Sequence, residues 1–149
     1  MSPRPTLIFD HAGIVVRDLA RGVRSIRTLL PIVSQTRRFD DEVLGVSVQF
    51  LRDQGGTIFE LIAPFGENSP VAKIASSRVG VINQFAYRVE NLVEAANYFR
   101  KNGGTPTAAA KPAVAFGGAL VQFFLAPDGF IVEFIEAPHF VHQFEPLES

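Results

Sequence analysis

The sequence matches itself when it is shifted by 73 positions, and this internal repeat restricts the fold more than any other feature. In this register residues 11–64 align with residues 84–137, and eleven of the 54 aligned pairs are identical. Unrelated segments of ordinary composition would give roughly three or four identities over this length. Both copies contain the tripeptide Val-Gln-Phe and the pattern Ile-x-Glu-x-Ile. The chain is therefore predicted to consist of two copies of one structural unit.

Each copy predicts the element order β-α-β-β-β from its apolar periodicity and its turn residues. The first copy predicts a strand at 11–16, a helix at 19–30 and strands at 34–40, 45–52 and 57–63. The second copy predicts a strand at 84–89, a helix at 91–102 and strands at 106–111, 119–125 and 130–136. Asp53-Gln-Gly-Gly56 and Pro127-Asp-Gly129 have the composition of hairpin turns and join the last two strands of each copy.

These elements predict an α+β fold in which two tandem βαβββ modules form an incomplete barrel around a central cavity. A single domain is expected over 1–149, and a helix between the modules is predicted from Ser69 as its N-cap and Pro70 at its first position. The expected parts are a module at 8–64, a linker helix at 67–78, a module at 81–138 and a C-terminal tail at 139–149.

Composition excludes several classes of protein. The chain has no Cys, so a disulfide framework, a Cys-based zinc site or a thiol nucleophile cannot form. A net charge of −1 argues against a nucleic-acid partner, and the apolar runs are too short for a membrane span. No apolar leader follows Met1, so we expect a cytoplasmic protein. Residues 1–38 contain seven Arg, which we interpret as solvated surface, with an anion-binding patch on the first helix as the alternative.

Strand alternation places four polar side chains at equivalent positions of the two copies. These are His11, Glu60, Gln84 and Glu133. Both carboxylates are flanked by Ile, where an unpaired charge would be costly. A divalent cation held by imidazole, amide and carboxylate atoms would compensate this charge and polarise a substrate carbonyl. The alternative is that Glu60 and Glu133 pair with Arg88 or share a proton.

The repeat and these four positions resemble the vicinal oxygen chelate superfamily, which includes glyoxalases, methylmalonyl-CoA epimerases, extradiol dioxygenases and bleomycin-resistance proteins. The most specific stretches are Asp10-His-Ala-Gly-Ile-Val-Val-Arg-Asp18, the segment 59–74 with its Ser-Pro-Val-Ala-Lys run, and Ala126-Pro-Asp-Gly-Phe-Ile-Val-Glu-Phe-Ile-Glu136. The middle stretch is most similar to the epimerase branch. The resemblance implies that His11, Glu60, Gln84 and Glu133 are ligands of a divalent metal such as Ni, Co, Mn or Zn.

Two positions depart from the epimerase pattern. Gln84 stands where most epimerases and bacterial glyoxalases carry His, and some glyoxalases use one Gln, one His and two Glu. The epimerases place a catalytic Glu two residues before a Gly-Val pair, where this chain has Val43. Glu42 lies one residue away, and a slip of one residue on a strand turns a side chain to the opposite face. Only an irregular loop would therefore let Glu42 serve as the second base.

The functional expectation is a metal-dependent isomerase or lyase that abstracts a proton α to a carbonyl, similar to methylmalonyl-CoA epimerase or to glyoxalase. The substrate would be an acyl thioester or a 2-oxo compound. The alternatives are a metal-free binding protein of the antibiotic-resistance type and a scaffold that only dimerises. Catalytic roles are expected for Glu133, Glu60 and Glu42, and substrate contacts for Arg88, Gln49, Gln122 and Phe116.

A salt bridge is the alternative interpretation of Arg88. The glycine-containing segment 111–118 suggests a lid, with an ordinary strand connection as the alternative. The tail is expected to pack its Phe side chains on the domain or on a partner. Its two histidines, His139 and His142, are not expected to reach a metal. The resemblance also implies a homodimer.

Overall fold

The computed structural model describes residues 4–77 and 82–148, and these residues form two compact units. One unit combines residues 11–82 with the C-terminal residues 141–149. The other combines the N-terminal residues up to Asp10 with residues 83–140. Each unit contains one copy of the repeat, so the α+β fold with two βαβββ modules is confirmed, while the cavity between the modules stays a prediction. The single-domain organisation also stays a prediction.

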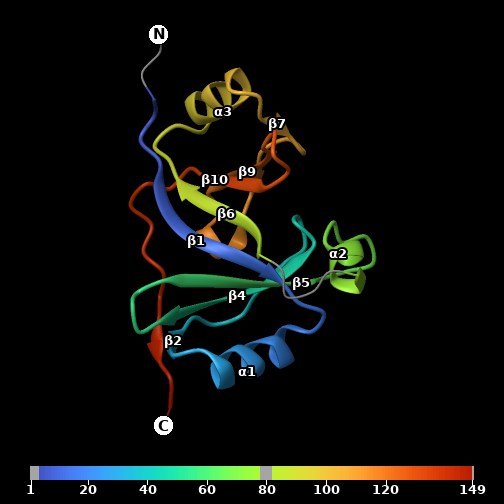
Figure 1. The fold of residues 1–149 in the computed structure, drawn as a ribbon, viewed down its shortest axis with the longest axis vertical. Helices are drawn as coiled ribbons and strands as arrows, with labels where there is room; N and C mark the ends of the chain where they lie inside the picture. Colours follow the sequence, from blue (N-terminus) through green and yellow to red (C-terminus); the bar gives the residue numbers. More distant parts are fainter. Residues whose placement is uncertain (1–3, 78–81, 149) are drawn as a thin grey trace. The chain divides into compact units, whose positions relative to one another are not determined.

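The first unit, named for the first copy of the repeat that it contains, has a sheet with one helix on one face (Figure 1). Its strands follow the order β11-β2-β4-β5-β1, and β3 adds to β4. The strands are β1 (Ile8–Val15, entering this unit at His11), β2 (Ile32–Gln35), β3 (Phe39–Asp41), β4 (Val46–Asp53), β5 (Ile58–Pro64) and β11 (Glu145–Pro146). Helix α1 (Leu19–Leu29) begins at Asp18, whose side chain accepts a hydrogen bond from the backbone N–H of Arg21.

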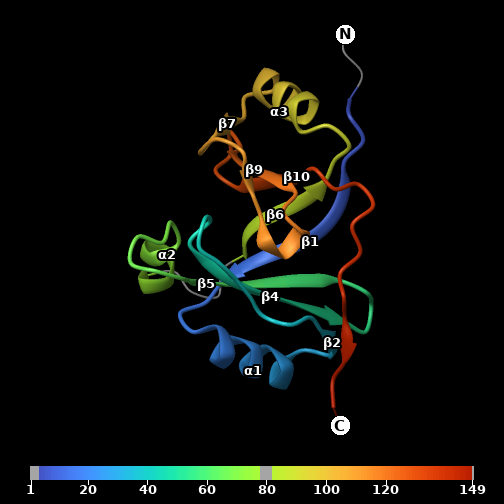
Figure 2. The ribbon, with the colours of Figure 1, turned by 180° about the vertical axis from the view of Figure 1, so that it is seen from behind.

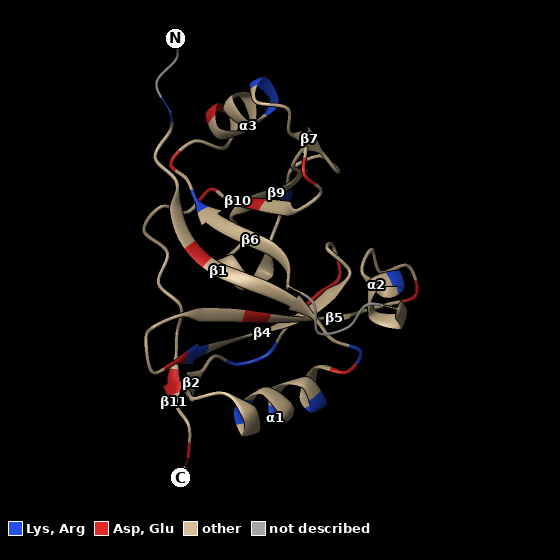
Figure 3. Ribbon diagram, viewed as in Figure 1, with Lys and Arg blue, Asp and Glu red and all other residues tan. Residues whose placement is uncertain are grey.

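The core of this unit lies between α1 and the sheet. It contains Leu19, Val23, Ile32, Leu51, Leu61 and Ala63. Apolar residues recur along α1 at helical spacing, and the Arg residues of the helix, which are coloured blue in Figure 3, are all exposed. β4 and β5 form the predicted hairpin, in which Gly56 N–H donates to the carbonyl of Asp53 at 3.0 Å. The face of the sheet opposite α1 carries the alternate residues of β4 and β5.

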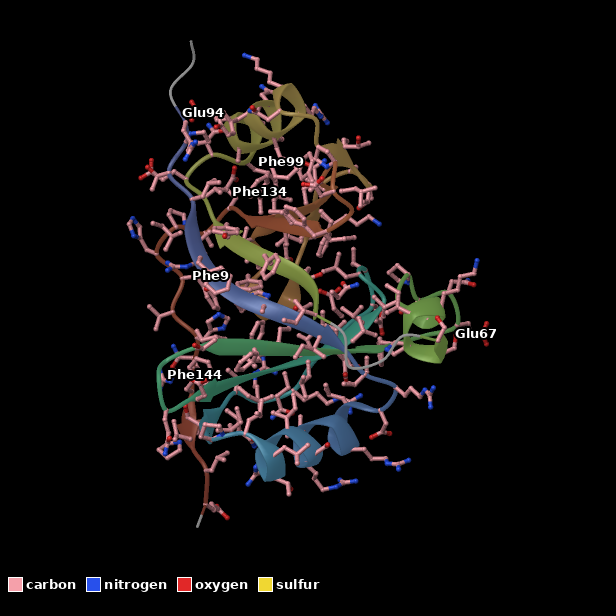
Figure 4. The ribbon with its side chains drawn as sticks, viewed as in Figure 1. Phe9, Glu67, Glu94, Phe99, Phe134 and Phe144 are labelled. Atoms are coloured by element: carbon pink, nitrogen blue, oxygen red, sulfur yellow. The ribbon has the colours of Figure 1, made fainter. Side chains whose placement is uncertain are left out.

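The second unit, which contains the second copy of the repeat, has the same arrangement. Its sheet order is β6-β10-β9-β7, with β8 added to β9. The strands are β6 (Ile82–Arg88), β7 (Thr105–Pro106), β8 (Lys111–Pro112), β9 (Leu120–Leu125) and β10 (Ile131–Ile135). Helix α3 (Leu92–Lys101) covers one face of this sheet, where Phe99 and Phe134 lie side by side with ring centroids 5.4 Å apart (Figure 4).

The structure corrects several predicted element bounds. The expected strand at 34–40 is two short strands, β2 and β3, separated at residues 36–38. The expected strand at 106–111 is reduced to the short strands β7 and β8, and a 3₁₀ turn follows at Val114–Phe116. Both helices are one or two residues shorter than expected, because the end residues of a helix lack part of its hydrogen bonding and fray.

The linker helix is shorter than its predicted range of 67–78. Helix α2 spans Ala72–Ser77, visible beside β5 in Figure 2, and a turn occupies residues 67–71. Ser69 lies within this turn: its carbonyl accepts from Ala72 N–H at 3.2 Å, and its hydroxyl donates to the carbonyl of Gly45 at 2.5 Å. Residue 78, the predicted end of the helix, and residue 81, the predicted start of the second module, lie outside the described residues.

None of the helices formed by the described residues is long and apolar enough to cross a membrane. The cytoplasmic location stays a prediction.

Asp40 on β3 gives the first unit a pH-dependent contact. Its carboxylate accepts from the hydroxyl of Ser47 at 2.6 Å and from Nε of Arg38 at 2.9 Å. The Ser47 hydrogen bond, followed by that of Arg38, lowers the pKa of Asp40 below its usual value. Ionised Asp40 therefore stabilises the fold above the pKa of the unfolded chain, and this contribution is lost as pH falls through the lower pKa of the folded state.

Replacing Asp40 with Asn is expected to lower the stability near pH 7 and to have a vanishing effect as the solution becomes strongly acidic. Urea unfolding of both proteins from pH 7 down to the acid range would measure this difference. Asp53→Asn is no suitable control because Asp53 fixes the β4–β5 turn, whereas the exposed Glu67→Gln provides one. A pH-independent difference for Asp40→Asn would contradict the expectation.

Candidate functional site

His11 and Glu60 form a buried pair in the first unit. His11 Nε2 lies 3.3 Å from Glu60 Oε1, and the two residues are 0 % and 5 % exposed. β1 and β5 run parallel with Gly13 opposite Glu60, so His11 is held on the strand next to the carboxylate. An imidazole nitrogen and a carboxylate oxygen at this separation are the types of donor that first-row divalent metals bind.

Gln84 and Glu133 form the corresponding buried pair in the second unit. Gln84 Nε2 donates to Glu133 Oε1 at 3.1 Å, and the two residues are 5 % and 3 % exposed. β6 and β10 run parallel with Ala86 opposite Glu133. An amide that donates through Nε2 to a carboxylate also carries an oxygen, which is an acceptable ligand for a hard cation.

The same local register explains both pairs. Gly13 opposite Glu60 and Ala86 opposite Glu133 are equivalent positions of the repeat, separated by 73 residues in each case. The ligand-type residue lies two positions before the small residue in each unit, which puts it on the same face of the sheet as the carboxylate. The four predicted metal ligands are therefore arranged as two buried pairs, one in each unit. Their nitrogen and oxygen donors suit the divalent metals named above.

Phe50 and His142 also contact His11 in the first unit. Phe50 lies opposite Glu60 on β4, and its ring centroid is 5.1 Å from that of His11. The ring of His142 is 4.4 Å from Phe50 and 6.4 Å from His11. The sequence interpretation expected no metal contribution from His142, and the structure places its ring beside the predicted ligand His11. No periodic pattern connects the tail to β1, so sequence reasoning had no signal for this contact.

Gln49 and Gln122 occupy equivalent positions of the repeat. In each unit the Gln lies on the face of the sheet opposite to the buried glutamate. Gln49 lies opposite Leu61, and Gln122 lies opposite Phe134, and both of these apolar partners belong to the cores beneath the helices. Gln49 Nε2 donates to the carbonyl of Thr36 at 2.7 Å, and Gln122 Nε2 donates to that of Ala108 at 3.0 Å. These bonds tie loops to the sheets and favour a structural role over the predicted contact with substrate.

Arg88 and Phe116 both have partners within the second unit. Arg88 Nε lies 3.2 Å from Asp10 Oδ1, and its Nη1 donates to the carbonyl of Pro138 at 2.6 Å. This geometry favours the salt-bridge interpretation of Arg88. Phe116 is buried and packs on Phe140, with ring centroids 4.9 Å apart. Phe140 therefore packs on the protein itself, as predicted for the tail.

Glu42 and Asp41 lie at the irregular turn between β3 and β4. Glu42 is exposed, whereas Asp41 is 3 % exposed and its carboxylate accepts from Leu44 N–H at 2.9 Å. Gly45 closes the turn with a positive φ of 70° and donates to the carbonyl of Asp41. Asp41 on β3 is opposite Val46 on β4, so its side chain lies on the same face of the sheet as that of Phe50. Sequence reasoning considered Glu42 and missed the buried carboxylate beside it.

The fold has two βαβββ modules, and each module holds a buried pair of metal-ligand-type side chains. This combination defines a class of proteins, and the comparison with known families points to the same class. The family model described as the glyoxalase/bleomycin resistance protein/dioxygenase superfamily matches residues 10–123. The chain belongs to this superfamily.

Relatives that match the chain include epimerases. The chain is 29% identical over 127 residues to an ethylmalonyl-CoA/methylmalonyl-CoA epimerase from Cereibacter sphaeroides, covering 83% of this chain and 93% of the relative. Its fold matches methylmalonyl-CoA epimerase from Mycobacterium tuberculosis with a TM-score of 0.73 at 24% identity, covering 91% of each chain. It also matches a Streptomyces coelicolor methylmalonyl-CoA epimerase in complex with 2-nitronate-propionyl-CoA, with a TM-score of 0.69 at 22% identity over 87% of this chain and 97% of the other. These proteins are enzymes, which agrees with the expectation from the sequence.

Proposed function

We propose that the protein is a metal-dependent enzyme that abstracts the proton α to the carbonyl of an acyl-CoA thioester, as an epimerase of the methylmalonyl-CoA type. The observation that carries the proposal is the pair of buried carboxylates, each beside an imidazole or amide side chain at an equivalent position of the repeat. We propose His11, Glu60, Gln84 and Glu133 as the ligands of one divalent cation. Similarity to the named epimerases supports the substrate class.

Burial explains why these residues suit such a reaction. The pairs are nearly inaccessible to water, so charges that develop near them are weakly screened. When bound, the cation supplies electrostatic stabilisation for the negative charge that forms on the thioester oxygen. Glu133 and Glu60 are the candidates to carry the proton, since a carboxylate beside the substrate is a suitable general base.

Inversion at the α carbon requires proton transfer on both faces of the substrate. Glu42 is proposed as the second proton carrier, because the turn at residues 42–45 removes the strict alternation of a strand. In a regular β3–β4 ladder its position would decide the face to which its side chain points, and the exposed side chain of Glu42 does not have this restriction. By the resemblance to epimerases, Val43 stands at the position of their base, and Glu42 precedes it by one residue.

Metal analysis and isotope exchange test the proposal. Protein purified without chelator, or reconstituted with Co²⁺, Ni²⁺, Mn²⁺ or Zn²⁺, is expected to contain close to one metal ion per chain. In D₂O it should exchange the C2 proton of (2R)-methylmalonyl-CoA and produce the 2S epimer. Absence of metal after reconstitution would contradict the metal-dependent enzyme and favour the metal-free binding protein. Metal uptake with no exchange would exclude this substrate, and the hemithioacetal of methylglyoxal and glutathione would then test the glyoxalase alternative.

Glu42→Gln separates the two proton transfers. If Glu42 is the second carrier, deuterium exchange at C2 should continue with the epimer whose proton the other carrier abstracts and stop with the opposite epimer, while inversion falls by about 10²–10⁴-fold, the usual contribution of a general acid or base. Exchange and inversion should be unaffected in the control Glu67→Gln, whose side chain is exposed on the loop before α2. Loss of exchange with both epimers, or unchanged inversion, in Glu42→Gln would contradict its assignment as the second carrier.

A further inference from the structure

The C-terminal segment 141–148 is anchored along the sheet edge of the first unit. β11 pairs antiparallel with β2, with Glu145 opposite Gln35 and Pro146 opposite Ser34. The backbone N–H of Leu147 donates to the carbonyl of Val33 at 3.1 Å, and the Leu147 side chain packs against the core beneath α1. Figure 2 shows this segment, in red, running alongside β2. The segment is therefore an integral part of this unit, although it follows the second copy of the repeat.

Aromatic contacts lead from this anchor towards His11. The guanidinium carbon of Arg52 lies 4.4 Å from the ring centroid of Phe144, which is labelled in Figure 4. Phe144 is 5.6 Å from His142, and His142 is 4.4 Å from Phe50. Arg52 is itself tied to β2 by a hydrogen bond from Nε to the hydroxyl of Ser34 at 3.2 Å. These contacts give the His142 ring a defined place.

His142 and Phe50 contact the His11 ring. The His142 and Phe50 rings are inclined to the His11 ring by 80° and 79°. One ring nitrogen of His142 lies within 4.8 Å of a ring nitrogen of His11. His11 is completely buried, so its ring orientation is determined by such neighbours rather than by water. A rotation of this ring about its side-chain bonds would move Nε2 away from Glu60.

We infer that His142 is a positioning residue for His11: it holds the His11 imidazole in the orientation that presents Nε2 to Glu60. The inference rests on the proposed function, in which His11 is a metal ligand. Metal-binding histidines generally need a partner beyond the metal that fixes ring orientation and tautomer. In this chain the C-terminal segment supplies such a neighbour, and His11 is the only imidazole in the proposed ligand set. Its orientation then matters more for metal affinity.

Histidine-ring NMR tests the inference in the metal-free protein. The chain has only three histidines, so long-range ¹H–¹⁵N spectra contain three imidazole patterns, and those of residues 139 and 142 are identified by their loss in the variants. At one fixed pH, His142→Ala and His142→Phe are expected to change the ring ¹⁵N shifts of His11. His139→Ala is the matched control, because His139 is an exposed histidine of the other unit and should leave the His11 signals unchanged.

Co²⁺ binding provides the second measurement. His142→Ala and His142→Phe should weaken Co²⁺ affinity by about tenfold or more and shift its visible absorption bands, as loss of an orienting partner usually does. His142→Phe retains a ring against Phe50, so it remains informative if His142→Ala does not fold. His139→Ala should bind Co²⁺ like the wild type.

The two hypotheses fail in different ways. The inference would be overturned if the His11 signals and the Co²⁺ bands were identical in His142→Phe and the wild type. Packing by any aromatic ring at residue 142 would then be sufficient to orient His11. A wild-type protein that takes up no Co²⁺ would overturn the proposed metal function, and with it a role of His142 in metal binding. If the His11 signals nevertheless changed in the His142 variants, the change would show that the C-terminal segment orients the His11 ring, without any role in binding a metal.

Discussion

Replacing Glu133 with Ala is expected to abolish the proposed catalysis and to reduce metal affinity by more than about 100-fold. Loss of a residue that merely orients a ligand already reduces metal affinity by about 10–100-fold, and removal of a ligand should cost more. The substitution also removes the acceptor of the Gln84 amide, which is bonded to Glu133 Oε1 at 3.1 Å in a buried position. An amide that loses its acceptor is destabilising by about 1–3 kcal/mol, so the unfolding free energy should fall as well.

Comparison of four variants separates these effects. Glu133→Gln keeps the side-chain volume and a carbonyl oxygen but removes the charge, so it should retain most of the stability and lose the metal. Glu60→Gln should behave in the same way, because the two positions are equivalent in the repeat. Glu67→Gln changes the charge by the same amount at an exposed site and should bind metal like the wild type.

The measurements are metal content after dialysis, Co²⁺ titration and the rate of C2 exchange. Normal metal stoichiometry in Glu133→Gln and Glu60→Gln would contradict the proposed ligand set. Loss of metal in Glu67→Gln would point to a general effect of net charge rather than to the buried carboxylates.

The internal repeat made the fold predictable. Two copies of one pattern had to form two copies of one unit, and the identical glutamates marked equivalent positions in both. Strand alternation then placed His11, Glu60, Gln84 and Glu133 at equivalent positions of the two copies. The structure brings His11 beside Glu60 and Gln84 beside Glu133, at 3.3 and 3.1 Å. The joint ligation of one metal by both pairs stays a prediction.

Cross-strand register was the part of the sheets that the sequence could not fix. Val-Gln-Phe recurs in both copies, and either Gln49 or Phe50 could have faced the glutamate until the β4–β5 register was known. The structure pairs Phe50 with Glu60, which turns Gln49 towards the core beneath α1. The sequence also did not indicate that Thr36, whose hydroxyl donates to the carbonyl of Arg37, lies in a break between two short strands.

Contacts made by the tail were unpredictable for a different reason. His142 and Leu147 follow the last repeat element, and nothing in their spacing indicates a return to the first unit. Their positions depend on the exposed edge of β2, which offers hydrogen-bonding groups to β11. Such long-range pairing is decided by tertiary packing rather than by local sequence.

Gly104→Ala is expected to be among the most destabilising single substitutions in the second unit. A Cβ at residue 104 would lie 1.7 Å from Cδ2 of Phe99, which is impossible without movement of the ring or the backbone. The backbone is restrained, because Gly104 N–H donates to the carbonyl of Phe99 at 2.9 Å. The ring is restrained as well, because Phe124 and Phe134 lie 5.5 and 5.4 Å from it in the core beneath α3.

We expect the unfolding free energy to fall by about 3 kcal/mol, at the upper end of the usual effect of overpacking. For a chain of this size the melting temperature should fall by roughly 2–4 °C per kcal/mol. Urea unfolding and thermal melts followed by circular dichroism would measure both quantities. Gly55→Ala is the matched control, since its Cβ would lie no closer than 3.6 Å to Asp53 Oδ1, and it should change stability by less than about 0.5 kcal/mol.

A double-mutant cycle identifies the Phe99 ring as the cause. Phe99→Ala alone should cost about 3–5 kcal/mol, as removal of a large core ring usually does. In that background Gly104→Ala has no ring to meet, and restriction of the unfolded chain should make it neutral or slightly stabilising. The two substitutions should therefore be strongly non-additive. Additive effects would show that the penalty at residue 104 arises from its own backbone and not from Phe99.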